Sequence, residues 1–486
     1  MAMKHLFFLV AIVVSLPSFA QTTLYQSFEV DSAAEVRGGI TFFYTFVQAN
    51  LRKPIRAEAQ GVGGRVILEG VVNPDGRIAE AKVLQHLRPD CDQEALRVFK
   101  LFNAWKPAQK NGQAVSQKVT MPIMFAKSTP FTYENESKID YFGSDNKLVT
   151  DSSQAQYKQI SPIDTTGLPV GDIIVYKRKG TSWKEDFRLP LVRKLNPPQS
   201  PTGETIQLIG YQNSDRLWER DLFHLDINGA RVRQEYYENG KKVGPEMTYH
   251  KNGSVADKTD DFTDKQAITS WYPTGQISQI RTALKFKALT PNQPDQVTGV
   301  WDSAGNQLVK DGQGQAVYQT KTTSRSDTTK ETQFVEQGLY KSGFKQGIWT
   351  GRYADESYAY QEIYDKGVCQ SGKAWSGGAD TTQYTVVMQQ PEFPGGLQGL
   401  GQFLSQNLSY PASAQKAGVQ GKVFISFVVC TDGTLCDYDV FKGVRPDIDQ
   451  EAVRVVKKMS GKWKPGSYRG QRVRVKYNLP INFNLY

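Results

Sequence analysis

The sequence predicts two α+β end modules, each a small antiparallel sheet with helices on one face, flanking an all-β region of repeated hairpins. Two patterns predict this arrangement. The two ends of the chain repeat one another, and between them aromatic residues and glycines recur at short spacing. The composition is that of a globular protein, with 39% hydrophobic and 22% charged residues in a chain of 486. A coiled coil, a collagen and a disordered chain are therefore excluded.

The first predicted element is a signal peptide over residues 1–20. Lys4 precedes an apolar run over 6–16, and Ser18 and Ala20 are the small residues that signal peptidase requires before its cleavage site. The run is shorter than the roughly 20 apolar residues of a transmembrane helix. We therefore expect cleavage after Ala20 and export from the cytoplasm. The alternative is an uncleaved signal that anchors the chain in the membrane.

Residues 35–125 and 392–483 share a series of motifs in the same order, which predicts one fold used twice. The matching pairs are Glu35-Val-Arg-Gly-Gly39 with Glu392-Phe-Pro-Gly-Gly396, Asn50 with Asn407, Asp75-Gly76 with Asp432-Gly433, Arg88-Pro-Asp with Arg445-Pro-Asp, and Trp105-Lys-Pro107 with Trp463-Lys-Pro465. We place the two modules at 30–127 and 384–486, and the second one serves to predict their elements.

The second module is predicted to contain a helix, two strands, a second helix and a last strand. A proline follows the helix expected over 397–408, and Asp432-Gly433 turns one alternating strand, 423–429, into another, 438–441. Asp449 is the expected cap of a second helix with an apolar stripe at i, i+3, i+4 and i+7. In the last strand, 471–483, apolar and basic side chains alternate between the two faces.

The region 131–375 is predicted to be a β-meander or solenoid of hairpins. An aromatic strand, a glycine turn and another aromatic strand recur, as in Tyr236-Tyr-Glu-Asn-Gly240, Trp271-Tyr-Pro-Thr-Gly275 and Gly343-x-x-x-Gly347-x-Trp349. The pattern resembles MORN-type repeats. We expect the rings to form the core and the glycines the turns; the alternative is an aromatic surface for a peptide or glycan. Residues 376–383 are the predicted linker to the last module.

The charge and the few reactive side chains argue against a nucleic-acid-binding protein and against an enzyme. Lys and Arg number 59 against 49 Asp and Glu, but an exported chain does not meet nucleic acid. The sequence holds only four His and four Cys, and no Gly-x-Ser-x-Gly, His-Glu-x-x-His or Cys-x-x-Cys motif. We predict no catalytic, cofactor-binding or metal-binding residues.

Two of the four cysteines flank the predicted hairpin turn. Cys430 and Cys436 can form a disulfide if they face each other across the hairpin, whereas a register slip of one residue would put them on opposite faces. Cys91 and Cys369 are left either free or paired, because the sequence does not choose among the three connectivities of four cysteines.

At these motifs the second module resembles the C-terminal domain of TonB, the periplasmic energy-transducing protein. The resemblance rests on the combination of Pro391-Glu-Phe-Pro-Gly-Gly396, Tyr410-Pro411, Asp432-Gly433, Trp463-x-Pro465 and Pro480-Ile-x-Phe483. The first module is similar but has diverged. Lys53 stands in place of the tyrosine, and Ala114, Ser116 and Lys118 stand where the second module has Arg472, Arg474 and Lys476.

The resemblance implies capture of a short extended peptide, the TonB box of outer-membrane receptors, as a strand added beside the last strand. The basic side chains of that strand would attract acidic flanks of the peptide; the alternative is that they only protect an edge strand from aggregation. The implied peptide-binding residues are Asn407, Tyr410, Pro411, Arg472, Arg474, Val475, Lys476 and Tyr477.

The implied partners are outer-membrane TonB-dependent receptors, and the implied role is support of TonB-dependent transmembrane transport from the periplasm. If the N-terminus is retained, an inner-membrane proton-channel complex becomes a further partner. Homodimer formation stays open. The competing interpretation is a structural envelope protein that uses the same modules to bind cell wall or other surface proteins.

Overall fold

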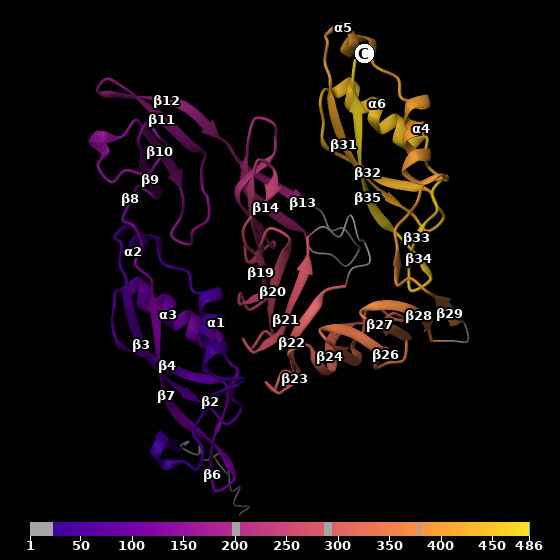
Figure 1. The fold of residues 1–486 in the computed structure, drawn as a ribbon. Helices are drawn as coiled ribbons and strands as arrows, with labels where there is room; N and C mark the ends of the chain where they lie inside the picture. Colours follow the sequence, from indigo (N-terminus) through magenta and orange to yellow (C-terminus); the bar gives the residue numbers. More distant parts are fainter. Residues whose placement is uncertain (1–22, 197–204, 286–293, 378–380, 486) are drawn as a thin grey trace, which may run out of the picture.

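The structure is a computed structural model that describes residues 23–196, 205–285, 294–377 and 381–485 (Figure 1). The signal peptide predicted over 1–20 lies outside these residues, so its cleavage stays a prediction. Strands predominate, and helices occur in the two end modules. None of the helices in the described part of the chain has the length and apolar character needed to cross a membrane.

The first module is a mixed sheet with the order β1-β7-β3-β4, to which β6 adds as a hairpin with β7. Helices α1 and α3 pack on one face of this sheet, and their apolar side chains form its core around the buried Trp105. Its elements are β1 (Leu24–Tyr25), β2 (Glu35–Val36), α1 (Ile40–Asn50), α2 (Ile55–Ala59), β3 (Gly64–Val72), β4 (Ile78–Gln85), α3 (Pro89–Leu101), β5 (Trp105–Lys106), β6 (Ala108–Lys110) and β7 (Gln113–Phe125).

The second module repeats this plan with a three-stranded sheet of order β32-β31-β35 and a smaller sheet of order β30-β33-β34. Helix α6 packs on β31 and β32, and the core surrounds Trp463. Its elements are β30 (Met388–Gln389), α4 (Gly396–Asn407), α5 (Ala412–Lys416), β31 (Gly421–Val429), β32 (Leu435–Lys442), α6 (Pro446–Lys457), β33 (Gly466–Tyr468), β34 (Gln471–Val473) and β35 (Val475–Phe483).

Two details of the second module differ from the sequence prediction. Helix α6 begins at Pro446, and its N-cap is Arg445. Asp449 therefore lies inside the first turn, where its carboxylate accepts a hydrogen bond from the backbone N–H of Val444 at 2.8 Å. The last strand is also divided at Arg474, because β34 pairs with β33 whereas β35 pairs with β31.

The middle region forms two antiparallel sheets in which the strands follow chain order, as expected for a meander. The first has five strands, β8 (Thr132–Glu134), β9 (Ser137–Phe142), β10 (Tyr157–Pro162), β11 (Ile173–Lys179) and β12 (Ser182–Leu189). The second has 17 strands among the described residues, β13 to β29. Strand order alone does not establish the likeness to MORN-type repeats.

The large sheet starts at β13 and ends at β29, which pairs with β28 and includes residues 381–383 of the segment expected to be a linker. Its strands are β13 (Leu191–Asn196), β14 (Ile206–Gln212), β15 (Trp218–Leu225), β16 (Arg231–Glu238), β17 (Lys241–Lys242), β18 (Glu246–Tyr249), β19 (Val255–Asp261), β20 (Lys265–Trp271), β21 (Ile277–Leu284), β22 (Gln296–Trp301), β23 (Gln307–Lys310), β24 (Gln313–Thr323), β25 (Glu331–Lys341), β26 (Phe344–Tyr353), β27 (Ala359–Asp365), β28 (Val368–Trp375) and β29 (Thr381–Tyr384).

Glycines in the large sheet lie directly opposite aromatic residues of the next strand. The pairs are Gly338 with Trp349, Gly351 with Tyr360, and Gly372 with Tyr384. A Cβ at any of these glycines would come within 2.1–2.3 Å of the facing ring. Because the ring covers the glycine, each pair fixes the register of its two strands.

The first module packs against the large sheet. The side-chain Oδ1 of Asn50, at the end of α1, accepts a hydrogen bond from the backbone N–H of Val255 at 2.8 Å, and the Asn50 residue is only 4% exposed. Phe42 meets the Trp301 ring edge-on at 5.1 Å between centroids. The core of the first module therefore continues into the sheet, and Figure 1 shows the two side by side.

Candidate functional site

The candidate site is the free edge formed by β34 and β35 in the second module. β35 pairs with β31 on one side, and β34 pairs with β33 on one side. In the described part of the chain, no strand pairs with the other side of either. The backbone N–H and C=O groups that point to this side can therefore receive a further strand.

Side chains along this edge alternate as the sequence predicts. Arg472, Arg474 and Lys476 are exposed, whereas Val475 and Tyr477 are half-buried and belong to the opposite face. Arg474 donates a hydrogen bond to the Asp437 carboxylate at 2.7 Å, but the two side chains are 57% and 65% exposed. Such an exposed ion pair contributes little to stability, so these cations remain available to a ligand.

The predicted disulfide partners lie beside Arg474. The sulfurs of Cys430 and Cys436 are 2.9 Å apart, and both cysteines are free thiols in the structure. Nη2 of Arg474 lies 3.3 Å from the Cys436 sulfur. Burial, followed by the hydrogen bond with Cys430, raises the pKa of the Cys436 thiol. The structure thus brings the pair together without joining it, and the disulfide stays a prediction.

The other two cysteines lie apart in the fold. Cys91 is buried in the core of the first module, and Cys369 lies on β28 of the large sheet. Burial raises the pKa of Cys91 to about 11. Both are free thiols.

Tyr477 occupies a core position within the predicted site. Its ring lies 4.9 Å from the Trp463 ring and 5.6 Å from the Phe427 ring, between centroids. Burial raises the pKa of its hydroxyl. Its contribution to the edge is therefore through its backbone groups.

The structure separates Asn407, Tyr410 and Pro411 from the basic residues. Asn407 ends α4 and donates its side-chain N–H to the Phe403 carbonyl at 2.9 Å, and Pro411 is the N-cap of α5. The Tyr410 ring packs edge-on at 5.8 Å from the Phe483 ring, at the far end of β35. Since a strand rises about 3.3 Å per residue, the nine residues of β35 keep the two groups roughly 25 Å apart.

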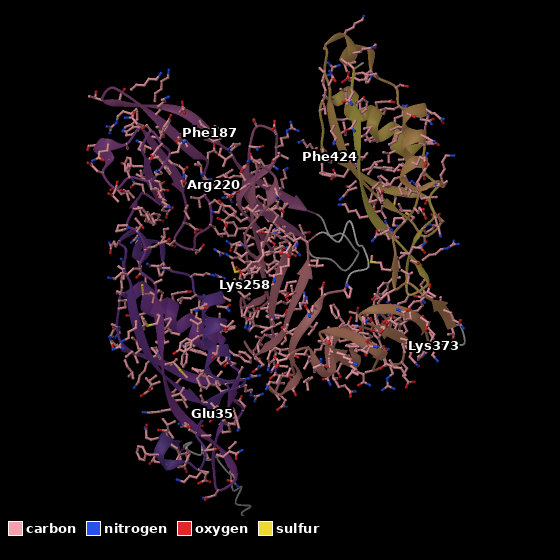
Figure 2. The ribbon with its side chains drawn as sticks, in the orientation of Figure 1. Glu35, Phe187, Arg220, Lys258, Lys373 and Phe424 are labelled. Atoms are coloured by element: carbon pink, nitrogen blue, oxygen red, sulfur yellow. The ribbon has the colours of Figure 1, made fainter. Side chains whose placement is uncertain are left out.

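The sheet face opposite the helices carries further aromatic and basic side chains. Figure 2 shows Phe424 on this face of the second module, and its ring lies 5.9 Å from the Phe441 ring, which is 53% exposed. The ammonium groups of Lys422 and Lys442 lie 5.9 and 5.8 Å from the Phe424 ring. This part of the sheet face, on β31 and β32, is therefore basic, which favours acidic ligands there.

Sequence reasoning missed Arg469, which fixes the hairpin that carries β34. Its guanidinium donates to the Glu362 carboxylate of β27 at 2.7 Å, and the two side chains are 9% and 0% exposed. The guanidinium also lies over the Tyr360 ring, 3.4 Å from its centroid. Burial acts to lower the pKa of Arg469, but the hydrogen bond with Glu362 and the electrostatic interactions with Glu362, Tyr360 and Tyr468 together raise it.

The sequence holds one signal for this contact. Arg469-Gly470 stands where the first module has Asn111-Gly112, and all four residues have positive φ. Asn-Gly is a preferred hairpin turn, whereas arginine is costly at such a position. An arginine at a turn that favours asparagine indicates a role other than the turn itself.

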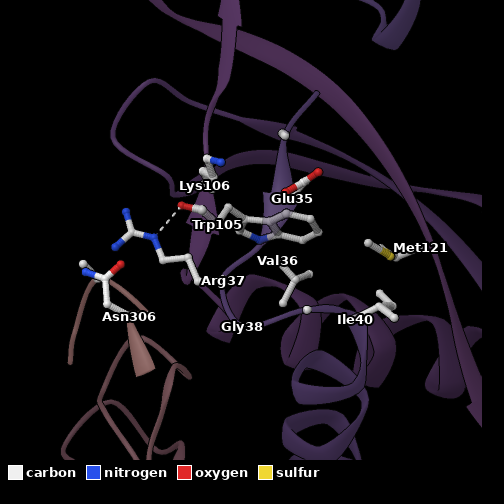
Figure 3. A pocket seen from close by; sticks show the side chains of 13 residues that line it. Glu35, Val36, Arg37, Gly38, Ile40, Trp105, Lys106, Met121 and Asn306 are labelled. Carbon is white, nitrogen blue, oxygen red and sulfur yellow. Dashed lines mark hydrogen bonds between the residues drawn. The ribbon is translucent and has the colours of Figure 1, made fainter. Parts of the chain in front are cut away.

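A cavity of about 700 Å³ lies between the first module and the β22–β23 turn (Figure 3). Residues 34–40 and 304–306 form its walls with Trp105, Lys106 and Met121. Arg37 crosses the junction, because its Nε donates to the Trp105 carbonyl at 2.9 Å and its Nη1 to the Ser303 carbonyl at 3.3 Å. The lining of the cavity includes charges of both signs, Glu35 with Arg37 and Lys106, so the charge of the cavity does not favour one class of ligand.

This architecture defines a class of protein. It consists of two helix-covered sheets, one with a free edge that carries exposed basic side chains, and a large β-meander between them. In the comparisons, the family model of the Gram-negative bacterial TonB protein C-terminal matches residues 50–126 and 406–485. Both end modules are thus similar to this family, whose members act in the envelope and interact with outer-membrane receptors.

The matched segments cover less than half of the chain and leave the meander unassigned. Two solution structures of the TonB C-terminal domain of Helicobacter pylori are similar to the chain at 24% and 26% sequence identity. Each covers 18% of this chain and 80% or 91% of the other, with a TM-score of 0.16 in both cases. No curated protein matches the chain.

Proposed function

We propose that this chain is a TonB-like periplasmic protein that binds extended peptide segments of outer-membrane receptors by strand addition at β34–β35. The role of this binding is to support TonB-dependent transmembrane transport. The family match of the second module supports the proposal at its coarse level. The observation that carries it is the free edge with Arg472, Arg474 and Lys476 exposed along it.

Binding would proceed by two physical contributions. The guest strand satisfies the unpaired backbone groups of the edge, which is independent of sequence, and the three cations attract acidic residues that flank the guest strand. The electrostatic part weakens as salt rises, because these cations are exposed to solvent. The chain acts as a binding protein in this proposal, with no catalytic step and no cofactor.

The test uses the full mature chain as bait for detergent-solubilised outer-membrane proteins. One variant replaces Arg472, Arg474 and Lys476 by Glu. A matched control replaces Lys416, Lys457 and Lys458 by Glu. These lysines are exposed on the same module, on or next to its helices and away from this edge, and their replacement changes the net charge equally. We expect the parent chain and the control to capture receptors and the edge variant to lose them.

A second readout locates the contact. Synthetic peptides from the extended N-terminal segments of the captured receptors should slow amide hydrogen exchange in β34 and the first half of β35. Equal capture by all three baits would refute binding at this edge. If no bait captures receptors and the intact chain sediments with cell-wall sacculi, the structural envelope role is favoured instead.

A further inference from the structure

The edge that is free in the second module is covered in the first. β1 pairs in parallel with β7, so that Leu24 faces Ser116 and Tyr25 faces Gln117. By the internal repeat, Ser116 corresponds to Arg474. A segment of the chain therefore occupies, in the first module, the position that stays open in the second.

Further contacts hold this segment on the β6–β7 hairpin. The Lys110 ammonium lies 4.2 Å from the centroid of the Tyr25 ring. The Asp31 carboxylate accepts a hydrogen bond from the backbone N–H of Asn111 at 2.5 Å, and its own N–H donates to the Gln109 carbonyl at 2.8 Å. An aromatic residue and, six positions later, an acidic residue thus recognise the edge and the adjoining turn.

The second module keeps the contact at the hairpin, because Gln389 pairs with Ser467 as Ser32 pairs with Gln109. It lacks only the β1 part of the cover, because the residues further upstream are used elsewhere. Thr381 and Thr382 correspond by the repeat to Leu24 and Tyr25, but they lie in β29 and pair with β28 of the large sheet. The turn at Gly470 packs against Thr382, because a Cβ on Gly470 would lie 2.4 Å from its methyl group. Because β29 belongs to the large sheet, it does not cover the edge of β35, whereas β1 covers the corresponding edge of β7.

The cover is short and shallow. β1 has two paired residues, Leu24 is 37% exposed, and Phe28 is 85% exposed in the same segment. Isolated pairing of so few residues is weak, and segments with little buried apolar surface open at low free-energy cost. A strand that pairs along more of the 13-residue β7 would compete with it.

We propose that the edge of β7 is a second strand-binding site, which the segment 24–32 covers reversibly. Its ligand is an extended polypeptide with an apolar–aromatic pair like Leu24-Tyr25 and an acidic residue about six positions later, running parallel to β7. The site opens when the chain's own segment leaves. This proposal does not depend on receptor binding by the second module.

The probe for this site is a fluorescent peptide with the sequence of residues 23–34. Its binding is measured by anisotropy to the mature chain and to a variant that lacks residues 21–32. All proteins carry the Glu substitutions at Arg472, Arg474 and Lys476, so that the second edge repels the probe, which carries Glu29 and Asp31. We expect the truncated variant to bind about tenfold more tightly, as for a site covered about nine-tenths of the time.

The control peptides carry Tyr25→Ser together with Asp31→Asn, or a scrambled sequence, and should bind weakly to the truncated variant. The proposal is overturned if the intact and truncated chains bind the peptide with equal affinity. It is also overturned if the truncated chain has a native circular dichroism spectrum but does not bind the peptide. If truncation prevents folding, the intact chain with Tyr25→Ser and Asp31→Asn replaces it. Faster amide exchange at residues 115–118 is then expected, and unchanged exchange there refutes the cover.

Discussion

Replacement of Arg469 by Met tests whether the buried ion pair fixes the second module on the large sheet. Methionine keeps an apolar chain of similar length against the Tyr360 ring and removes the guanidinium. The Glu362 carboxylate, whose side chain is fully buried, then keeps as donors from the described residues the hydroxyls of Tyr364 and Tyr384, at 2.9 and 2.8 Å. A buried carboxylate without its cation is strongly unfavourable.

The expected cost is about 3–5 kcal/mol, the range for removing one partner of a buried ion pair. Arg474→Met is the matched control, because its ion pair with Asp437 is 57% and 65% exposed. Exposed pairs contribute about 0–1 kcal/mol, so the control should unfold almost as the parent chain does. The two arginines lie five positions apart, so both substitutions remove one positive charge from the same part of the module.

The stability of each variant is measured by urea unfolding that is followed by amide hydrogen exchange. The exchange is compared at β28 and β33, the strands beside the ion pair. We expect Arg469→Met to lower the protection of both strands and Arg474→Met to leave it unchanged. The double variant Arg469→Met, Glu362→Gln should recover part of the loss, because no charge then stays buried. If Arg469→Met and Arg474→Met lower the free energy of unfolding by the same amount, the ion pair does not anchor the module.

Three further predictions use the same protein. Asn50→Ala removes the side chain that joins α1 to the large sheet and should lower the free energy of unfolding in urea by about 1–3 kcal/mol. Asn407→Ala is the control, because Asn407 is the counterpart of Asn50 in the second module, and an equal or larger loss in this control would contradict the prediction. Gly338→Ala puts a methyl group 2.2 Å from the facing tryptophan and should cost about 1–3 kcal/mol; an unchanged urea midpoint would show that the ring can move. Burial acts to raise the pKa of Glu336, but the Lys345 ammonium, the Tyr360 hydroxyl and the Arg469 charge together lower it overall. Its stabilising effect should therefore be complete above the usual glutamate pKa and be lost as pH falls through the lower folded-state value; a melting temperature that falls as steeply with acid in Glu336→Gln would contradict this.

The duplication and the elements of the second module could be predicted because short-range chemistry specifies them. Asp432-Gly433 supplies the turn between β31 and β32, and the alternation around Arg474 sets which side chains face the core. These signals depend on spacing within one element, which a sequence displays directly. The free edge was predicted for the last strand of the second module, but the place of a strand in the chain does not guarantee it, because β7, the last strand of the first module, is covered by β1.

The remaining features depend on contacts between distant segments. The pairing of β1 with β7 joins residues about 90 positions apart, and no pattern in Leu24-Tyr25 indicates its partner. Arg469 resembles an ordinary turn residue unless it is compared with Asn111. The separation of Tyr410 from Arg474 follows from the length of β35, which a motif in the sequence does not show.

The strand order of the large sheet has a mechanical consequence. Each strand is bonded to its neighbour in the chain, and in antiparallel pairs the hydrogen bonds are perpendicular to the strands. The first module contacts the sheet at β19 and β22, and the second at β27. Tension that pulls the two modules apart would separate the strands between them one pair at a time. Each residue released from the sheet would add about 3.3 Å to the length of the chain. The region would then lengthen stepwise under load and limit the force that passes from one module to the other.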